Sequence, residues 1–264
     1  MAFLAMPGPY DFALSTERFR VFGVDRATVW HEGGLHRVVD GREVRIEAAA
    51  GGVDVEPFDD AAGELLGLPF DLDPFYAWAA GEQVLHHVAT RLRGFRPPLM
   101  PEPFEMLVGS ITAQQVSLFS ATAIRNRLIE RFGERHEVAW AFPTRERIAA
   151  ADEGELVALG FSLRKEEYIL GLARSDLDLD ELRGLPDDEV RTRIVAVRGL
   201  GEWTAEWFLA RHLARPHAWP WGDLALRKAV ADLYRGLDVR EARERFHPFE
   251  NLSAHYLLLA QRVP

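Results

Sequence analysis

The chain has 264 residues, no cysteine, a net charge of −10 and 48% apolar residues. The lack of cysteine excludes disulfides, thiolate metal sites and cysteine-held iron–sulfur clusters. No apolar run is long enough for a membrane span, so we expect a cytoplasmic protein of one large domain or two to three small ones. The acidity is uneven: residues 1–90 hold 15 acidic and 6 basic side chains, whereas residues 91–264 are nearly neutral.

The first 90 residues predict an N-terminal α+β domain. Alternating and β-branched residues predict short strands at 19–24, 27–31, 35–39, 44–48 and 53–55. Asp40-Gly41 lies between two of these runs and is a strong hairpin signal. We interpret the runs as an antiparallel meander, followed by helices around 59–66 and over 73–90.

The pattern changes at a proline-rich linker, residues 97–103, after which no convincing strand is found. Apolar residues at helical spacing predict helices at 105–117, 118–132, 145–151, 153–159, 163–175, 187–197, 202–214, 224–236 and 248–262. The predicted fold is therefore mostly α, with an α+β domain over residues 1–90 and a helical domain over residues 91–264.

Gly199-Leu200-Gly201 joins two of the predicted helices in a short hairpin. Glycine tolerates positive φ and lets another backbone approach closely. The second helix opens with unpaired N–H groups and the positive end of its dipole, which together suit a phosphate. We therefore expect Gly199 and Gly201 to contact DNA phosphate, with the Thr204 hydroxyl adding a contact or capping the turn.

The run Gly199-Leu200-Gly201-x-x-Thr204-Ala205 resembles the helix-hairpin-helix motif. Asp223 follows 22 residues after Gly201, behind Pro220 and Gly222. This spacing is similar to that of the DNA glycosylases of the helix-hairpin-helix, Gly/Pro-rich loop, Asp superfamily. The further runs at 111–117, 142–144, 149–152 and 159–161 resemble the alkylation-repair branch, the DNA-3-methyladenine glycosylase II (AlkA) type.

Motifs carry that resemblance over residues 97–264. Over residues 1–90 only the predicted order of elements is similar. It implies an N-terminal domain like the TATA-binding protein and a two-lobed helical body. The implied activity is excision of flipped alkylated purines of the 3-methyladenine type in base excision repair, leaving an abasic site. The implied partner is double-stranded DNA with damaged bases; we expect a monomer that associates with the nucleoid when it acts.

Asp223 is the expected catalytic residue, because a carboxylate can stabilise the cationic sugar formed when the base leaves. As an alternative, Asp223 caps the helix that starts at Leu224, and both roles are compatible. Relatives that also cut the strand place a Schiff-base lysine two residues after the second hairpin glycine. Trp203 occupies that position here, so the resemblance implies an enzyme without lyase activity.

Trp203 and Trp207 are four residues apart and share a helix face. They are either core residues or two walls that sandwich a cationic flipped base. Phe249 is expected to line this pocket from behind. Leu224 stands where members of the family have an aromatic residue, which changes one wall of the pocket.

Gln114 and Gln115 lie where the family inserts a residue into the gap left by the flipped base. Gln115 is the expected wedge, although the two glutamines could equally top a helix. The resemblance also implies that the carbonyls of Val195, Val197 and Gly199 bind a structural monovalent cation; no other cofactor is expected.

Two alternative functions remain open. A glycosylase of the same fold could act on deaminated or oxidised bases, which the change at Leu224 would allow. A non-catalytic protein could use the hairpin only to hold DNA, but this reading leaves the position of Asp223 unexplained.

Overall fold

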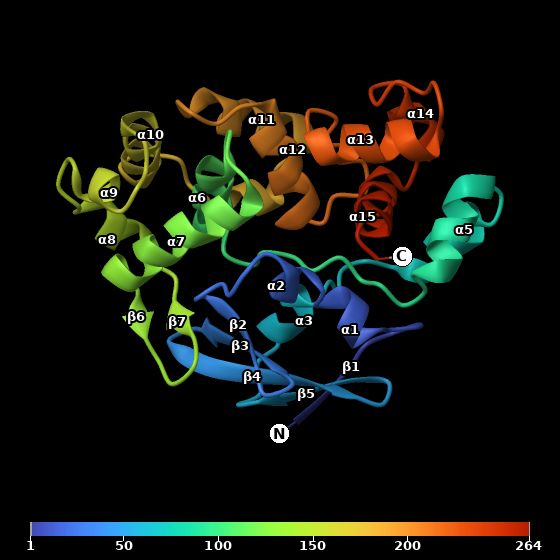
Figure 1. The fold of residues 1–264 in the computed structure, drawn as a ribbon, viewed down its shortest axis with the longest axis horizontal. Coiled ribbons are helices and arrows are strands. Elements are labelled where there is room, and N and C mark those ends of the chain that lie inside the picture. Colours follow the sequence, from blue (N-terminus) through green and yellow to red (C-terminus); the bar gives the residue numbers. More distant parts are fainter. Residues whose placement is uncertain (1, 264) are drawn as a thin grey trace.

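The computed structural model describes residues 2–263 and places an antiparallel sheet beneath a larger helical body (Figure 1). The sheet has the strand order β1-β5-β4-β3-β2, and all neighbours are antiparallel. Its strands are β1 (Ala2–Ala5), β2 (Thr28–His31), β3 (Gly34–Val39), β4 (Arg42–Ala49) and β5 (Gly52–Glu56). The predicted meander is thus confirmed for β2 to β5. Strand β1 pairs with β5 and forms the edge of the sheet opposite β2.

The hairpin between β3 and β4 turns at Asp40 and Gly41, as predicted. Both residues have positive φ, 46° and 71°, and Val39 pairs with Arg42. This is the geometry of a two-residue turn whose twist matches that of the flanking strands. The predicted strand at 19–24 is wrong, because Arg18–Val21 forms the short helix α2.

One face of the sheet carries its own small core. In β4, Val44 and Ile46 are buried while the intervening Arg45 is partly exposed. The buried face packs against Phe12 of helix α1 (Phe12–Ser15) and Leu65 of helix α3 (Ala61–Leu65). The sheet is therefore half-buried, as an antiparallel sheet with alternating residues should be.

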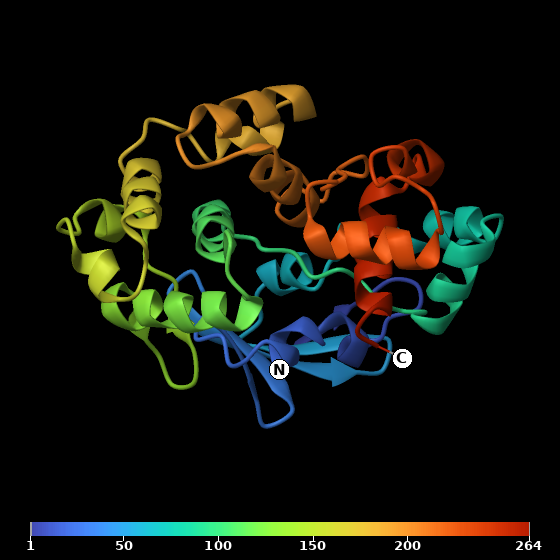
Figure 2. The same cartoon turned by 45° about the horizontal axis from the view of Figure 1, so that its top comes forward.

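The remaining elements form the helical body and its connections. They are α4 (Leu72–Ala79), α5 (Gln83–Arg91), α6 (Pro103–Ala113), α7 (Leu118–Phe132), α8 (Arg145–Ala149), α9 (Glu155–Ala158), α10 (Leu163–Ala173), η1 (Glu181–Gly184), α11 (Asp187–Ala196), α12 (Glu202–Arg211), α13 (Leu224–Leu233), α14 (Ala242–Phe246) and α15 (Glu250–Ala260). A two-stranded ribbon, β6 (Glu134–Arg135) with β7 (Trp140–Ala141), was not predicted. Figure 2 shows these helices in two groups, one green to yellow and one orange to red, with the teal α4–α5 pair beside the red group.

The helical core extends into the part of the chain that the sequence assigned to the N-terminal domain. Phe75 of α4 packs against Tyr256 of α15, with ring centroids 4.8 Å apart. The predicted helix over 73–90 is interrupted because Glu82 caps a new helix, its carboxylate accepting a hydrogen bond from Leu85 N. By core membership the chain divides between Leu66 and Phe70, so α4 and α5 belong to the helical body.

A buried ion-pair network joins the sheet to the helices. Glu105 of α6 accepts hydrogen bonds from Arg37 of β3 and Arg125 of α7, at 2.5 and 2.7 Å. Arg125 also pairs with Asp25, at 2.8 Å. Burial opposes ionisation of Glu105, but the two guanidinium groups outweigh it and lower its pKa to about 2. The network fixes the sheet domain against the body.

No helix within residues 2–263 is both long and apolar enough to cross a membrane.

Candidate active site

Asp223 caps helix α13 and is held at both carboxylate oxygens. Its Oδ1 accepts hydrogen bonds from the backbone N–H groups of Ala225 and Leu226, at 2.9 and 3.0 Å. Its backbone is extended, with φ −75° and ψ 124°, as is usual for a helix N-cap. The capping role predicted as an alternative is thus present, and it fixes the direction of the carboxylate.

The other oxygen of Asp223 is held by two tryptophans of α12. The indole Nε1–H groups of Trp203 and Trp207 donate to Oδ2, at 3.2 and 3.1 Å. The position of both residues on one helix face is what brings the two donors together. The four-residue spacing predicts a shared helix face but not the direction of the indole N–H groups, so these hydrogen bonds were not predicted.

The predicted sandwich between the two indoles is not formed. Trp207 is only 2% exposed, and the guanidinium of Arg211 lies 3.7 Å from its ring centroid. His255 of α15 meets the same ring at an angle of 62°, with centroids 5.7 Å apart. Trp207 therefore supports Asp223 from within the core, and only the partly exposed Trp203 could offer a face to a base.

The other two predicted pocket residues lie differently from expectation. Phe249 packs against Phe75 and Trp78 of α4, with centroids 5.8 and 5.5 Å apart, so it belongs to an aromatic cluster of the core. Leu224 follows Asp223 directly and is 78% exposed. In this structure Leu224 is an apolar side chain at the surface beside the carboxylate, not an enclosed wall.

The loop that carries Asp223 is anchored by charged side chains that the sequence analysis missed. Glu206 of α12 accepts a hydrogen bond from Trp219 N at 2.7 Å and pairs with Arg191 of α11 at 2.6 Å. Further along, the buried carboxylate of Glu250 contacts Nδ1 of His217 and of His247, at 3.1 and 3.2 Å. These contacts tie the loop to α11 and α15, although the residues are far apart in sequence.

The glycine hairpin between α11 and α12 forms as predicted. Gly199 has φ +93°, and a Cβ there would lie 2.2 Å from the ring of Tyr168. Gly201 begins α12 without a side-chain cap, and a Cβ there would meet nothing within 4 Å. The space at the helix N-terminus is therefore open to an anion.

Thr204 does not take the role that the sequence suggested. It is 1% exposed and lies inside the first turn of α12, where Gly201 is the N-cap. A phosphate outside the hairpin could not reach its hydroxyl without rearrangement, so the predicted Thr204 contact is wrong for this conformation.

Gln114 and Gln115 have different surroundings in the structure. Gln114 Nε2 donates to the carbonyl of Gly199 at 2.9 Å and ties α6 to the hairpin. Gln115 has φ +56° and is exposed at the turn between α6 and α7. The neighbouring Leu118 and Phe119 are also exposed, at 49% and 62%. The tip of this turn is thus a projecting, partly apolar surface.

The backbone of the hairpin suits a cation only in part. The Val197 carbonyl accepts a hydrogen bond from Leu200 N at 3.1 Å, and the Gly199 carbonyl accepts from Gln114. Each carbonyl oxygen keeps a second lone pair. Val195, the third predicted contributor, is 43% exposed at the end of α11.

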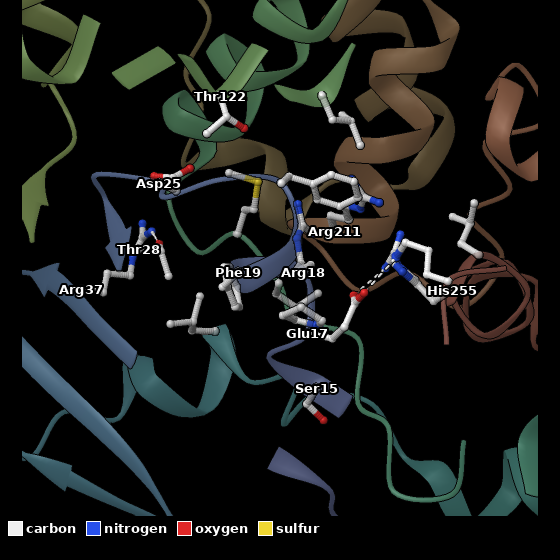
Figure 3. A pocket seen from close by; sticks show the side chains of 18 of the residues that line it. Ser15, Glu17, Arg18, Phe19, Asp25, Thr28, Arg37, Thr122, Arg211 and His255 are labelled. Atoms are coloured by element: carbon white, nitrogen blue, oxygen red, sulfur yellow. Dashed lines mark hydrogen bonds and ion pairs between the residues drawn. The ribbon is translucent and has the colours of Figure 1, made fainter. Parts of the chain in front are cut away.

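A cavity of about 180 Å³ lies between the sheet domain and the helical body (Figure 3). Its lining includes Arg18, Phe22, Leu118, Arg211, His255 and Arg262. Figure 3 shows Arg18, Arg211 and His255 among the side chains that line it, together with the carboxylate of Glu17. Arg211 and His255 also contact Trp207, which donates to Asp223, but neither Trp207 nor Asp223 belongs to the lining of the cavity.

A glycine hairpin followed by a capped, indole-bound aspartate at the start of the next long helix defines a helix-hairpin-helix base excision repair fold. The chain belongs to the HhH-GPD superfamily of base excision DNA repair proteins, whose family model matches residues 108–251. Its sequence is 32% identical to DNA-3-methyladenine glycosylase of Bacillus subtilis over 175 residues, which is 63% of this chain and 58% of that protein.

The similarity to solved structures extends over a greater length of the chain. The 3-methyladenine DNA glycosylase of Archaeoglobus fulgidus superimposes with a TM-score of 0.88 at 29% identity, covering 99% of this chain and 98% of that one. The 3-methyladenine DNA glycosylase of Schizosaccharomyces pombe, solved with abasic DNA, gives a TM-score of 0.61 at 25% identity, covering 70% and 94%. The chain spans only about half the length of the first curated relatives it matches, at 58% and 50%.

Proposed function

We propose that this protein is a monofunctional DNA glycosylase that excises alkylated purines and leaves an abasic site. The observation that carries the proposal is the Asp223 carboxylate, held by four donors beside the open N-terminus of a hairpin helix. The similarity to the 3-methyladenine glycosylases of Bacillus subtilis and Archaeoglobus fulgidus supports the choice of alkylated purines.

The geometry favours charge stabilisation as the role of Asp223. A carboxylate offers roughly four acceptor positions, and here two N–H groups occupy each oxygen. As the bond between base and sugar breaks, positive charge grows on the deoxyribose, and a fixed negative charge beside it lowers the barrier. The attacking water then gives its oxygen to the sugar and its proton to solvent.

The absence of a lysine at position 203 supports hydrolysis without strand cutting. Trp203 occupies the place from which an amine would attack the sugar, and its indole N–H donates to Asp223 instead. An indole nitrogen cannot form a Schiff base, because its lone pair belongs to the aromatic ring. Lys165, on α10, donates its ammonium group to the carbonyl of Thr112.

DNA is proposed to lie across the hairpin and the α6–α7 turn. The free N–H groups at Gly201 would bind a backbone phosphate, and the exposed Gln115 would enter the gap left by the extruded base. The carbonyls of Val195, Val197 and Gly199 would hold a monovalent cation at the same hairpin, where it would offset phosphate charge.

The proposal is tested with a panel of duplexes, each with one methylated, deaminated or oxidised base, and with borohydride present or absent. We expect release of free alkylated base, abasic sites that break only with alkali, and no covalent trapping of the protein. Release of an oxidised or deaminated base alone would show that the substrates are not alkylated purines. Trapping by borohydride would contradict the monofunctional assignment.

A further inference from the structure

Three side chains of metal-binding types meet where the loop that leads to Asp223 passes the start of α15. Among residues 2–263, one group of three His, Asp or Glu side chains holds its ligand atoms within 4.8 Å of one another, namely His217, His247 and Glu250. His217 belongs to the loop, His247 follows α14, and Glu250 begins α15. Glu250 lies 33 residues from His217 in the sequence, so the fold is what brings the group together.

The carboxylate of Glu250 faces both imidazoles through their Nδ1 atoms. Its Oε2 lies 3.1 Å from Nδ1 of His217, and its Oε1 lies 3.2 Å from Nδ1 of His247. Zinc binds imidazole nitrogen and carboxylate oxygen at about 2.0–2.2 Å, so two ligand atoms of a tetrahedral ion are about 3.4 Å apart. The observed distances are close to that value. An ion could therefore replace the two hydrogen bonds with only small movements of the side chains.

The three side chains differ in their access to water. Glu250 is 4% exposed, whereas the side chains of His217 and His247 are 44% and 64% exposed. Their rings stack with centroids 5.0 Å apart and planes at 20°. Because both rings reach solvent, each neutral imidazole can carry its proton on Nε2 and donate it to water, which leaves the lone pair of Nδ1 free for a metal ion.

The backbone around the group is held in place by other hydrogen bonds. Asn251 N donates to the carbonyl of Pro216 at 3.0 Å, and the Asn251 side-chain amide donates to the carbonyl of Arg215 at 2.9 Å. These bonds join the residues before His217 to the residue after Glu250. Two of the three ligands are thus positioned before an ion binds, which lowers the entropy lost on binding.

The groove over the group carries more negative than positive charge. It is lined by the carboxylates of Asp187, Asp188, Glu244 and Glu250 and by the guanidinium groups of Arg191 and Arg243. Arg191 is already paired with Asp188 and with Glu206, at 2.7 and 2.6 Å. Asp187 is paired with Arg215 at 3.3 Å. With these partners included, carboxylates still outnumber guanidinium groups, so the groove favours a cation.

We propose that His217, His247 and Glu250 form a binding site for a divalent transition-metal ion of the zinc type. Two imidazoles and one carboxylate are a ligand set that zinc uses, with water in the fourth position, and the open groove gives water access. The ion would link the loop before Asp223 to α15. The site is separate from the hairpin carbonyls, and the inference does not depend on glycosylase activity.

The experiment titrates the metal-free full chain with Zn²⁺ by calorimetry and with Co²⁺ by visible absorption. We expect one ion per chain and much weaker binding of Mg²⁺, which prefers oxygen ligands. His217→Asn and His247→Asn keep an amide N–H for Glu250 but remove an imidazole ligand. Each should weaken Zn²⁺ binding by at least about tenfold and change the Co²⁺ spectrum.

The matched control is His31→Asn. His31 lies in β2, is 49% exposed and stands 3.7 Å from the carboxylate of Glu32, so it is a comparable histidine beside an acid in the sheet domain. This variant should bind Zn²⁺ as wild type does. Added Zn²⁺ should also raise the melting temperature of wild type and of His31→Asn, but not that of the other two variants.

Melting without metal separates a metal site from a purely structural cluster. His217→Asn and His247→Asn should melt within about 2 °C of wild type, because the residues are exposed and the amide keeps a hydrogen bond to Glu250. Wild type that binds no Zn²⁺ would overturn the proposal. Unchanged Zn²⁺ affinity in both variants, or an equal loss in His31→Asn, would overturn it as well, because zinc would then bind to other surface groups.

Discussion

The two oxygens of Asp223 differ in what holds them. Backbone N–H groups of its own helix hold Oδ1, while Oδ2 depends on the side chains of Trp203 and Trp207. A mutation cannot easily remove the first pair of hydrogen bonds, but it can remove the second. The tryptophans are therefore the residues through which the orientation of Asp223 can be tested.

Replacing Trp207 by phenylalanine removes one donor to Asp223 and keeps an aromatic ring in the core. We expect the single-turnover excision rate to fall about tenfold, since a hydrogen bond to a charged group contributes about 1.5–3 kcal/mol. Affinity for an abasic-site duplex should change little.

Trp219→Phe is the matched control. The indole of Trp219 is equally buried, but it donates to the carbonyl of Val239, at 2.7 Å. This variant should lose stability without slowing excision. If both variants slowed excision equally, the effect would come from a loosened core and not from Asp223.

The position of Asp223 at the start of a helix could be predicted from sequence, because it depends on local information. The partners of Asp223 could not all be predicted in the same way. The backbone donors follow from a helix start, but the indole hydrogen bonds depend on the angle between α12 and α13. Likewise, Phe249 and Thr204 have suitable residue types and positions in the chain, yet packing buries Thr204 and turns Phe249 toward α4.

At the scale of elements, the hairpin between α11 and α12 has two glycines with different requirements. Gly199 needs both its positive φ and the space beside Tyr168, whereas Gly201 is extended and has open space around it. Only the first glycine is thus required by the fold. The second leaves room for a ligand at the start of α12.

A pair of alanine substitutions separates these requirements. Gly199→Ala should lower the free energy of unfolding by on the order of 2–4 kcal/mol, because of the clash and the positive φ. Gly201→Ala should leave stability nearly unchanged and weaken binding to abasic-site DNA. Denaturant unfolding and a DNA-binding titration measure the two effects. Equal loss of stability in both variants would contradict this view of the hairpin.

Prediction at this scale was accurate for long periodic helices and weak for short elements. The predicted helix at 118–132 matches α7, and strands β2 to β5 of the sheet were predicted. Residues 19–24 were predicted to form a strand because apolar residues alternate there. The observed helix Arg18–Val21 is too short to show a helical period. Helix α14 is also too short to show a clear period.

At the scale of the whole molecule, the buried pairs of Glu105 link the core of the sheet domain to that of the helical body. The network links β3, α6 and α7, and thereby closes one side of the cavity that contains Arg211. No sequence pattern pointed to it, since Arg37 and Glu105 are 68 residues apart. Contacts of this kind depend on tertiary structure alone.

The network predicts a pH dependence of stability. The folded-state pKa of Glu105 is about 2, below its ordinary value, so its contribution is complete above the unfolded pKa of about 4.5. That contribution, on the order of 3 kcal/mol, should be lost as pH falls from 4.5 toward 2. Unfolding measured across this range should show the loss in wild type.

Glu105→Gln provides the comparison. It should cost about 3–5 kcal/mol at neutral pH, because Arg37 and Arg125 are left without their shared carboxylate. It should also flatten the dependence between pH 4.5 and 2. A variant whose stability still fell as steeply as that of wild type would show that other carboxylates cause the acid sensitivity.

The central claim, that Asp223 is the catalytic group of a DNA glycosylase, is tested most directly by single-turnover excision with wild type and Asp223→Asn. The substrates are an ethenoadenine duplex and methylated genomic DNA, and binding of an abasic analogue confirms that the variant is folded. We predict that wild type releases base and that the variant is slower by about a hundredfold or more, about 2.7 kcal/mol of barrier. Release of base at similar rates by both proteins, or DNA binding by both without any release, would contradict the account.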